Sequence, residues 1–393
     1  MEKRKLESNV WKLYCARAMR SFVMTMPIIV LFFKDNGLSM QEIFLLQALF
    51  SVAVIILEVP TGYFADVFGR KNSIVIGGVV STLGFVIYSL SSSFWWFLLA
   101  EVALGIGISF ISGSDSAMLF DTLLELKRVE EYKKIEGRGM SLGLASESVA
   151  AIAGGLLAIV SLRLPLIGDA LTMSLIIPVS LTLVEPKRKT IKPGESSLRN
   201  IFRIMRFSLH EDKKLKWLII HSSFVAASTL TMVWFIQPYL LEAGVPLGLF
   251  GFLWAILIFV AAFFSWHAHA VEDFLGKGKL LIFIAAAPVV GYFLLSCLHF
   301  VWSGVFILLF YVTRGINGPI TSFYINGQID SDARATILSI KNLLMRVIFS
   351  IVGPVVGGLA DTHSLKFALA VSGITFLFLG AISLFMLRGH KAL

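Results

Sequence analysis

The sequence predicts an all-α membrane protein in which twelve transmembrane helices form two pseudo-symmetric six-helix bundles. Of the 393 residues, 57% are hydrophobic and 15% are charged, whereas about a quarter of the residues of soluble proteins are charged. Twelve apolar runs are each long enough to cross a hydrocarbon core of about 30 Å. Similar acidic, glycine-containing turns follow the second and the eighth run, which indicates that six helices form one repeat.

Each apolar run is taken as one helix, because about 20 residues at a rise of 1.5 Å span the bilayer. The expected spans are 12–33, 40–65, 72–92, 94–122, 139–161, 164–184, 216–240, 247–270, 279–299, 301–328, 335–360 and 365–387. The longest polar stretch separates the sixth span from the seventh. We therefore expect a six-helix bundle at 1–184, a basic cytoplasmic linker at 185–214 and a second six-helix bundle at 215–393.

The basic residues orient these spans. With the N-terminus inside, most of the 34 Lys and Arg residues fall on cytoplasmic segments, and only Lys34, Arg163 and Lys366 fall outside. Because Lys and Arg are enriched on the cytoplasmic side of membrane proteins, both termini are expected in the cytoplasm. The bacterial cytoplasmic (inner) membrane is the default location. This distribution also explains the net charge of +9 without a nucleic-acid partner.

The linker itself allows two interpretations. Arg199, Arg203 and Arg206 recur at helical spacing between apolar residues, as in a short helix that lies on an anionic lipid surface. The alternative is a solvated basic linker.

Several classes of chemistry find no support in the sequence. Cys15 and Cys297 lie in runs placed near opposite membrane faces, so no disulfide is expected. His267 and His269 are two residues apart and face different sides of a helix, so no metal site is expected. The motifs of nucleotide-binding loops, zinc proteases and serine hydrolases are absent from the sequence. We expect neither enzymatic activity nor a cofactor.

Residues 62–71 carry a family resemblance. They read Gly-Tyr-Phe-Ala-Asp-Val-Phe-Gly-Arg-Lys and resemble the loop signature of the major facilitator superfamily, Gly-x-Leu-Ala-Asp-x-x-Gly-Arg-Lys, lacking only its Leu. A degenerate copy around Asp273 and Gly276 follows the eighth span. Together with the spans and the central linker, the resemblance covers essentially the whole chain. It implies a monomeric transporter that moves a small molecule by alternating access.

The resemblance also implies roles for this loop. Gly62 lets two helices approach closely, and Gly69 permits a tight turn that points Arg70 and Lys71 at the inner lipid surface. In the family, the Asp of the loop, here Asp66, clasps the start of the eleventh helix, and the Arg meets an acid that ends the fourth helix, a position that Asp121 fits. Such a latch would stabilise one state of the alternating-access cycle. The alternative is that these charges only set topology and turn shape.

Two departures from the family bear on the substrate. Glu101 stands four residues before Gly105, where the antiporter signature of the fourth helix has Arg. The exporter signature of the fifth helix, Gly-Pro-x-x-Gly-Gly, survives only in Gly154-Gly155, although a fuller copy occupies 353–358 in the eleventh span. Export is therefore favoured only weakly.

Charged residues inside spans are functional candidates, because burying a charge in the bilayer is costly. Arg17 and Arg20 lie on one face of the first helix, at a depth similar to that of Asp115, which predicts pairing. Glu58 and Lys341 also match in depth and are candidates for an ion pair between the halves.

Arg314 and Arg346 project nearer the middle of the membrane and, with Arg17 and Arg20, are the candidates for substrate binding. Their alternative role is hydrogen bonding within one half, to carbonyls or to Asn317 and Asn342. The candidates for proton coupling are acidic, and for each of them a structural hydrogen bond is the alternative; they are Glu58, Glu147, Glu101, Asp115 and, towards the outer side, Asp169.

These observations together favour proton-coupled export of an amphipathic or partly anionic compound. An uptake symporter or uniporter for an organic anion or nutrient is the first alternative, and a nontransporting scaffold or receptor is the second. The expected partners are a small-molecule substrate, protons and the lipid bilayer.

Overall fold

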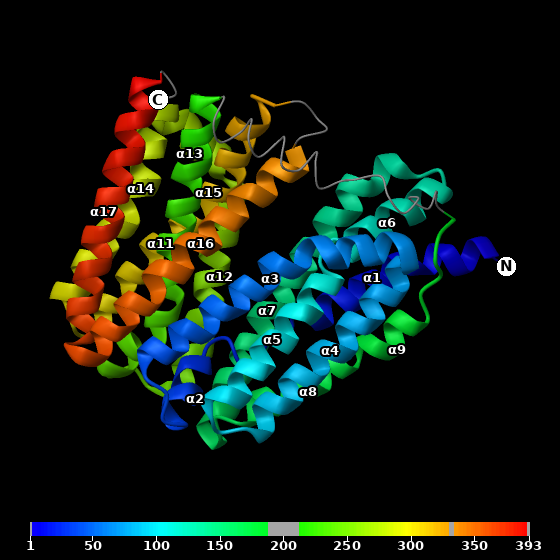
Figure 1. Ribbon diagram of the computed structural model, residues 1–393, viewed down its shortest axis with the longest axis horizontal. Coiled ribbons are helices and arrows are strands. Elements are labelled where there is room, and N and C mark those ends of the chain that lie inside the picture. Colours follow the sequence, from blue (N-terminus) through cyan, green and yellow to red (C-terminus); the bar gives the residue numbers. More distant parts are fainter. Residues whose placement is uncertain (1, 188–211, 330–333, 391–393) are drawn as a thin grey trace. The chain divides into compact units, whose positions relative to one another are not determined.

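The structure, a computed structural model, describes residues 2–187, 212–329 and 334–390, and this part of the chain is helical throughout with no strand (Figure 1). The helices of the first half are α1 (Glu2–Ser21), α2 (Ile29–Asp35), α3 (Met40–Phe68), α4 (Arg70–Leu90), α5 (Phe94–Ile111), α6 (Ser114–Glu125), η1 (Val129–Glu131), α7 (Tyr132–Val160), α8 (Leu164–Ser174) and α9 (Ile176–Leu181). Those of the second half are α11 (Lys213–Glu242), η3 (Leu247–Leu249), α12 (Phe250–Trp266), α13 (Ala268–Leu275), α14 (Lys277–Cys297), η4 (Val301–Ile307), α15 (Leu308–Asn326), α16 (Arg334–Thr362) and α17 (Leu365–Gly389).

The helices cluster into two compact units. The first unit consists of Met1–Leu38, Leu49–Glu195 and Leu247–Ala255, and the second of Ser39–Ala48, Ser196–Pro246 and Ile256–Leu393. The units follow the two halves of the sequence, except that the first turns of α3 cluster with the second unit and the first turns of α12 with the first. The predicted domain boundaries at 184 and 215 stay a prediction.

Within the first unit, α4 packs against α5 and α8, and α1 packs against α7. Glycines of α7 allow α1 and the segment that follows it to come close: a Cβ atom on Gly139 would lie 2.7 Å from a guanidinium nitrogen of Arg17 in α1, and one on Gly154 would lie 1.8 Å from the backbone oxygen of Met24, beyond the end of α1. Small residues let neighbouring membrane helices approach in this way.

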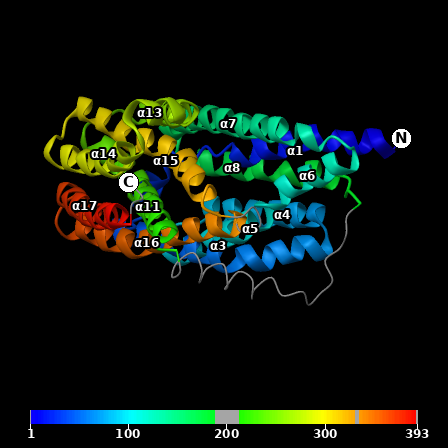
Figure 2. The ribbon, with the colours of Figure 1, turned by 90° about the horizontal axis from the view of Figure 1, so that it is seen from above.

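Within the second unit, α11 packs against α15, α16 and α17, and α14 packs against α17 (Figure 1 and Figure 2). The N-terminus of α3 is held here by Asp361 near the end of α16, whose carboxylate accepts hydrogen bonds from the backbone N–H groups of Met40 and Gln41, both at 2.8 Å. Because the first amides of a helix have no partner within it, an acid at this position stabilises the helix start.

The predicted fold class is confirmed, and one span needs correction. Eleven helices of the described residues are long and apolar enough to cross a membrane, and they correspond to the second to twelfth predicted spans. The first predicted span, 12–33, is not one helix, because α1 ends at Ser21 and α2 begins at Ile29. Pro27 lies in the interruption, lacks an N–H donor and disfavours helix in the residue before it.

Four further predicted spans are interrupted. The fourth, 94–122, changes from α5 to α6 at Gly113, whose φ of +78° only glycine adopts easily. The sixth, 164–184, changes from α8 to α9 next to Leu175, where Pro178 removes the hydrogen bond to Ser174. The eighth changes from α12 to α13, and the tenth begins as the 3-10 helix η4. The expected amphipathic segment around Arg199 lies outside the described residues.

Candidate functional site

The loop between α3 and α4 forms the predicted cluster of charges. Gly69 has a φ of +111° and directly precedes α4. Arg70 pairs with Asp121 of α6, Nε to Oδ2 at 2.8 Å, and more weakly with Asp66 at 3.6 Å. The predicted pairing of Arg70 with Asp121 is therefore confirmed. The expected contact of Asp66 with the eleventh helix would join the two units, and it stays a prediction.

Glu185 adds a contact that the sequence did not predict. Its carboxylate accepts hydrogen bonds from the backbone N–H groups of Arg70 and Lys71, at 2.9 and 2.8 Å. The acid thus compensates the positive N-terminal end of α4. The loop is consequently held by α6 and by the segment after α9 at the same time.

The second unit repeats this turn with different partners. Gly276 has a φ of +74° and precedes α14 as Gly69 precedes α4. Lys277 lies over the ring of Tyr324, 4.9 Å from its centroid, and the hydroxyl of Tyr324 donates a hydrogen bond to Glu272. Asp273 lies in α13 one turn before Gly276. The internal repeat thus preserves the turn while its charged contacts differ.

A cluster of charges in the first unit surrounds Arg17, which is only 7% exposed. Its Nε lies 3.3 Å from Asp115 Oδ2, and a terminal nitrogen lies 3.1 Å from Glu136 Oε2. Arg20 also pairs with Asp115, at 3.1 Å, which confirms the pairing predicted from depth. Ser116 ties the cluster together, because its hydroxyl accepts from Arg17 and donates to Glu136.

This cluster lines a cavity of roughly 340 Å³ between α1, α6 and α7, to which Glu147 also contributes. On α7, Glu136 and Glu147 are three helical turns apart on one face, with Gly139 and Gly143 between them. The glycines leave room for Arg17 and for Ser21, whose oxygen would lie 3.0 Å from a Cβ on Gly143. The cavity therefore holds two arginines and three carboxylates.

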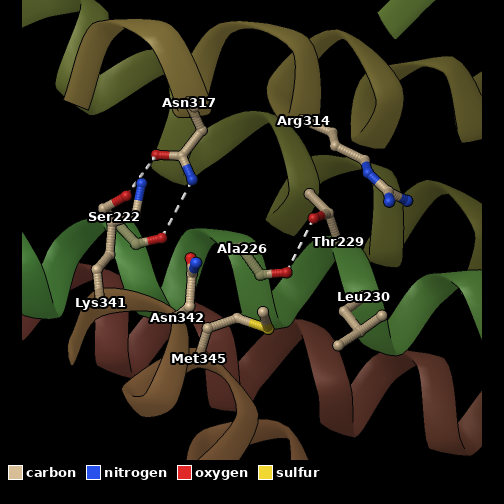
Figure 3. A pocket seen from close by; sticks show the side chains of 10 residues that line it. Ser222, Ala226, Thr229, Leu230, Arg314, Asn317, Lys341, Asn342 and Met345 are labelled. Atoms are coloured by element: carbon tan, nitrogen blue, oxygen red, sulfur yellow. Dashed lines mark hydrogen bonds between the residues drawn. The ribbon is translucent and has the colours of Figure 1, made fainter. Parts of the chain in front are cut away.

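The second unit has its own polar cavity of roughly 210 Å³ (Figure 3). Arg314 and Lys341 supply its two charges, and the remaining lining residues are neutral: Ser222, Ala226, Thr229, Leu230, Asn317, Gly318, Asn342 and Met345. Arg314 is thus on a cavity wall, as expected of a substrate-binding candidate. Arg346 of α16 is half-buried and is not among these lining residues.

Hydrogen bonds fix one side of this second cavity. The side-chain amide of Asn317 donates to the backbone oxygen of Ser222 at 3.1 Å, and its oxygen accepts from the Ser222 hydroxyl at 3.2 Å. Lys341 donates to the hydroxyl of Ser322 at 3.2 Å. Asn317 therefore bonds to Ser222, and the alternative role of Arg314 and Arg346, hydrogen bonding to Asn317 or Asn342, stays a prediction.

The other acidic candidates lie outside both cavities. Asp169 is 1% exposed and accepts hydrogen bonds from the backbone N–H groups of Met24 and Thr25, at 2.7 and 3.1 Å, which favours its structural alternative. Glu101 is buried beside the hydroxyl of Tyr88. Glu58 is exposed on α3 in the first unit, so its pairing with Lys341 of the second unit stays a prediction.

Sequence reasoning missed Glu136 as a cavity residue, because the fifth span was begun at 139 whereas α7 begins at Tyr132. The available signal was the spacing of 136, 139, 143 and 147, which places two acids and two glycines along one helix face. Lys341 was recognised as an intramembrane charge but not as a neighbour of the Arg314 cavity.

Comparisons with known proteins agree with this architecture. The MFS-type transporter YxaM of Bacillus subtilis (strain 168) is 25% identical over 363 residues, which are 88% of this chain and 89% of the relative. The nucleoside transporter NupG superposes with a TM-score of 0.77 at 12% identity, covering 98% of each chain. The D-xylose-proton symporter superposes with a TM-score of 0.69 at 15% identity, covering 99% of this chain and 96% of that one. At such low identity these structures establish the fold alone.

The family assignment has sequence support as well. A model of the major facilitator superfamily matches residues 13–354, which include the loop at Gly69, both polar cavities and most of α16. The relatives are transporters and not enzymes. The chain therefore belongs to the major facilitator superfamily and is a membrane transporter of the secondary type.

Proposed function

We propose that the protein exports an amphipathic or partly anionic compound in exchange for protons, by alternating access. The cavity of the first unit carries this proposal. It places Asp115, Glu136 and Glu147 around a shared space between α1, α6 and α7. Intramembrane carboxylates that face a cavity are the usual carriers of protons in transporters.

Protonation of the acids in this cavity would weaken its ion pairs. Arg17 holds Asp115 and Glu136 together, and protonation of either acid would remove half of that attraction. An ion pair that is nine-tenths buried is worth a few kcal/mol only while both partners are charged. A change of this size is enough to shift a two-state equilibrium substantially. Glu147 is the candidate that exchanges protons directly with the cavity, and Glu58 is the second.

Export is favoured by the remnant of the exporter signature, Gly154-Gly155, and by its fuller copy at 353–358. A second candidate function, uptake of an organic anion by symport or uniport, is favoured by Arg314 and Lys341, which give the other cavity two positive charges. The two functions differ in the direction in which a proton gradient drives the compound.

Everted membrane vesicles distinguish them. Respiration acidifies the lumen of such vesicles, and a pH-sensitive acridine dye reports the gradient. A compound exported in exchange for protons releases luminal protons, so amphipathic anions and neutral drugs added outside should restore the dye fluorescence. We expect this release to vanish in Glu147→Gln and to persist in the matched variant Glu130→Gln, because Glu130 is exposed in η1, just before α7, and does not line the cavity.

The outcome decides between the functions. Restored fluorescence with Glu147→Gln at the wild-type level would remove Glu147 from proton coupling. If no compound releases luminal protons, but a preloaded organic anion accelerates counterflow of the labelled anion in proteoliposomes, the uptake alternative is correct and the exporter proposal fails.

A further inference from the structure

The polar cavity of the second unit differs from that of the first in the balance of its charges. Arg314 and Lys341 line it, and none of its ten lining residues is acidic. Among the described residues of this unit, neither cation forms an ion pair with a carboxylate. The first cavity, in contrast, surrounds its two arginines with three acids. Two uncompensated cations inside a membrane helix bundle are costly, so the cavity needs a compensating partner.

The two cations act on different parts of the cavity. Lys341 bonds Ser322, which lies eight residues after Arg314 on α15, and eight residues of helix span about 12 Å. In Figure 3 the side chains of Lys341 and Arg314 lie toward opposite ends of the labelled set, with Asn342 between them. The positive potential therefore extends along the cavity.

The remaining wall residues provide both hydrogen-bonding groups and an apolar surface. Asn317 is fixed by two hydrogen bonds to Ser222, whereas the side chain of Asn342 is exposed, and its amide can donate to an oxygen of a ligand and accept from one. Ala226, Leu230 and Met345 supply an apolar surface on the same cavity. Ligand pockets commonly combine such an apolar wall with a few placed polar groups.

We infer that this cavity is an organic-anion site, in which the positive potential of Arg314 at one end and Lys341 at the other holds a ligand that carries a carboxylate or phosphate group, and Asn342 between them hydrogen-bonds the same ligand. Arg offers a planar fork for the anionic oxygens, and Lys offers a compact charge. This inference rests on the proposed transport function and names its substrate class. It assigns Lys341 to ligand binding in place of a constitutive ion pair with Glu58.

The charge of the cavity can be measured without knowing the substrate. The full chain, with Cys15 and Cys297 changed to Ser, carries the single substitution Asn342→Cys and is purified in detergent. Its labelling rates with the anionic reagent MTSES and the cationic reagent MTSET are each divided by the rates with a free thiol. We expect this ratio to favour the anionic reagent by about tenfold, because two cations that line the same cavity as position 342 raise the local concentration of anions.

Four variants and one matched position test the assignment. Arg314→Gln and Lys341→Gln should each lower the ratio by about threefold, and Lys341→Arg should restore it, which separates loss of charge from loss of folding. Leu144→Cys, which lines the carboxylate-containing cavity, should not favour the anionic reagent. Glu58→Gln should leave the ratio at position 342 unchanged. A higher reagent ratio at position 342 in the Glu58→Gln variant would show that Glu58 neutralises Lys341, and it would overturn the role of Lys341 in ligand binding.

Ligand protection identifies the anionic group. Asn342→Cys is labelled with a neutral methanethiosulfonate in the presence of four phenyl compounds: benzoate, phenyl phosphate, benzyl alcohol and benzyltrimethylammonium. Protection equals one plus the ratio of ligand concentration to dissociation constant, so a ligand at twice that constant slows labelling about threefold. We expect protection by benzoate or phenyl phosphate, and the stronger of the two indicates the carboxylate or phosphate class.

Two further results would overturn the inference. One is a reagent ratio at position 342 that is no higher than the ratio at position 144, and the other is protection by the ammonium compound that equals protection by the anions. Neither measurement depends on protons or on flux. The anion site can therefore fail while the vesicle assay succeeds, and the exporter proposal can fail while the anion site stands.

Discussion

Gly154→Ala should destabilise the protein far more than the addition of one methyl group normally does. The new Cβ atom would lie 1.8 Å from the backbone oxygen of Met24, whereas Cβ contacts under 3.0 Å essentially never occur. The segment around Met24 must therefore move by more than about 1 Å. Overpacking a dense core costs about 1–3 kcal/mol, and here the obstacle is backbone, which cannot rotate away.

The movement also disturbs a hydrogen bond. The Met24 N–H donates to the buried side chain of Asp169 at 2.7 Å, and leaving a buried hydrogen-bonding group unsatisfied costs about 1–3 kcal/mol. The combined cost of Gly154→Ala is about 3 kcal/mol or more. At about 2–4 °C per kcal/mol, the apparent Tm should fall by about 6–12 °C.

Differential scanning fluorimetry of the purified protein in detergent measures this change. Gly137→Ala is the matched control, because Gly137 lies in the same helix α7 and a Cβ there would meet no atom within 4 Å. Ala is the better helix former by about 1 kcal/mol, so the control should leave Tm unchanged or raise it. Equal Tm values for the two variants would refute the proposed close packing of α7 against the segment around Met24 that follows α1.

Two further predictions concern charged contacts. Either Arg70→Gln or Asp121→Asn should lower Tm by about 2–6 °C, since this pair is mostly buried and breaking it leaves the other charge unpaired. Exchanging the two residues in one double variant should recover part of the loss. A double variant with a Tm no higher than that of the single variants would argue against direct pairing. Asp361→Asn should lower Tm by only about 1–3 °C, because Asp361 is exposed and a helix cap contributes about 1 kcal/mol. A decrease in Tm as large as that of Gly154→Ala would show that Asp361 does more than stabilise the start of α3.

Much of the fold could be predicted because it depends on local sequence. Apolar length determines where a helix can span the bilayer, and this located the helices from α3 to α17. The interruption after Ser21 depends on more than its own sequence. Pro27 signals it, but Asp169 of α8 supplies acceptors for the released N–H groups, and a partner 145 residues away is not visible in a local pattern.

The site was predictable to the extent that depth alone decides contacts. Arg17 and Asp115 match in depth and pair as expected. Depth does not determine the rotation of a helix about its own axis, which decides the cavity that a side chain faces. Lys341 matched Glu58 in depth, yet in the structure it lines the cavity that contains Arg314.

The presence of one acidic and one cationic cavity raises the question of how proton binding and anion binding affect each other. Where protons and an anion are carried in one cycle, protonation of the acids around Arg17 changes the affinity for an anion at Arg314, and linkage makes this effect reciprocal. Tighter anion binding on acidification is the sign required for symport. Exchange against protons requires the opposite sign. Protection of Asn342→Cys by benzoate, compared at about pH 6 and about pH 8, where benzoate is ionised throughout, measures this sign. Stronger protection at the lower pH would favour uptake of an organic anion over the exporter that the remnant at Gly154 suggests, and weaker protection would support proton-driven export.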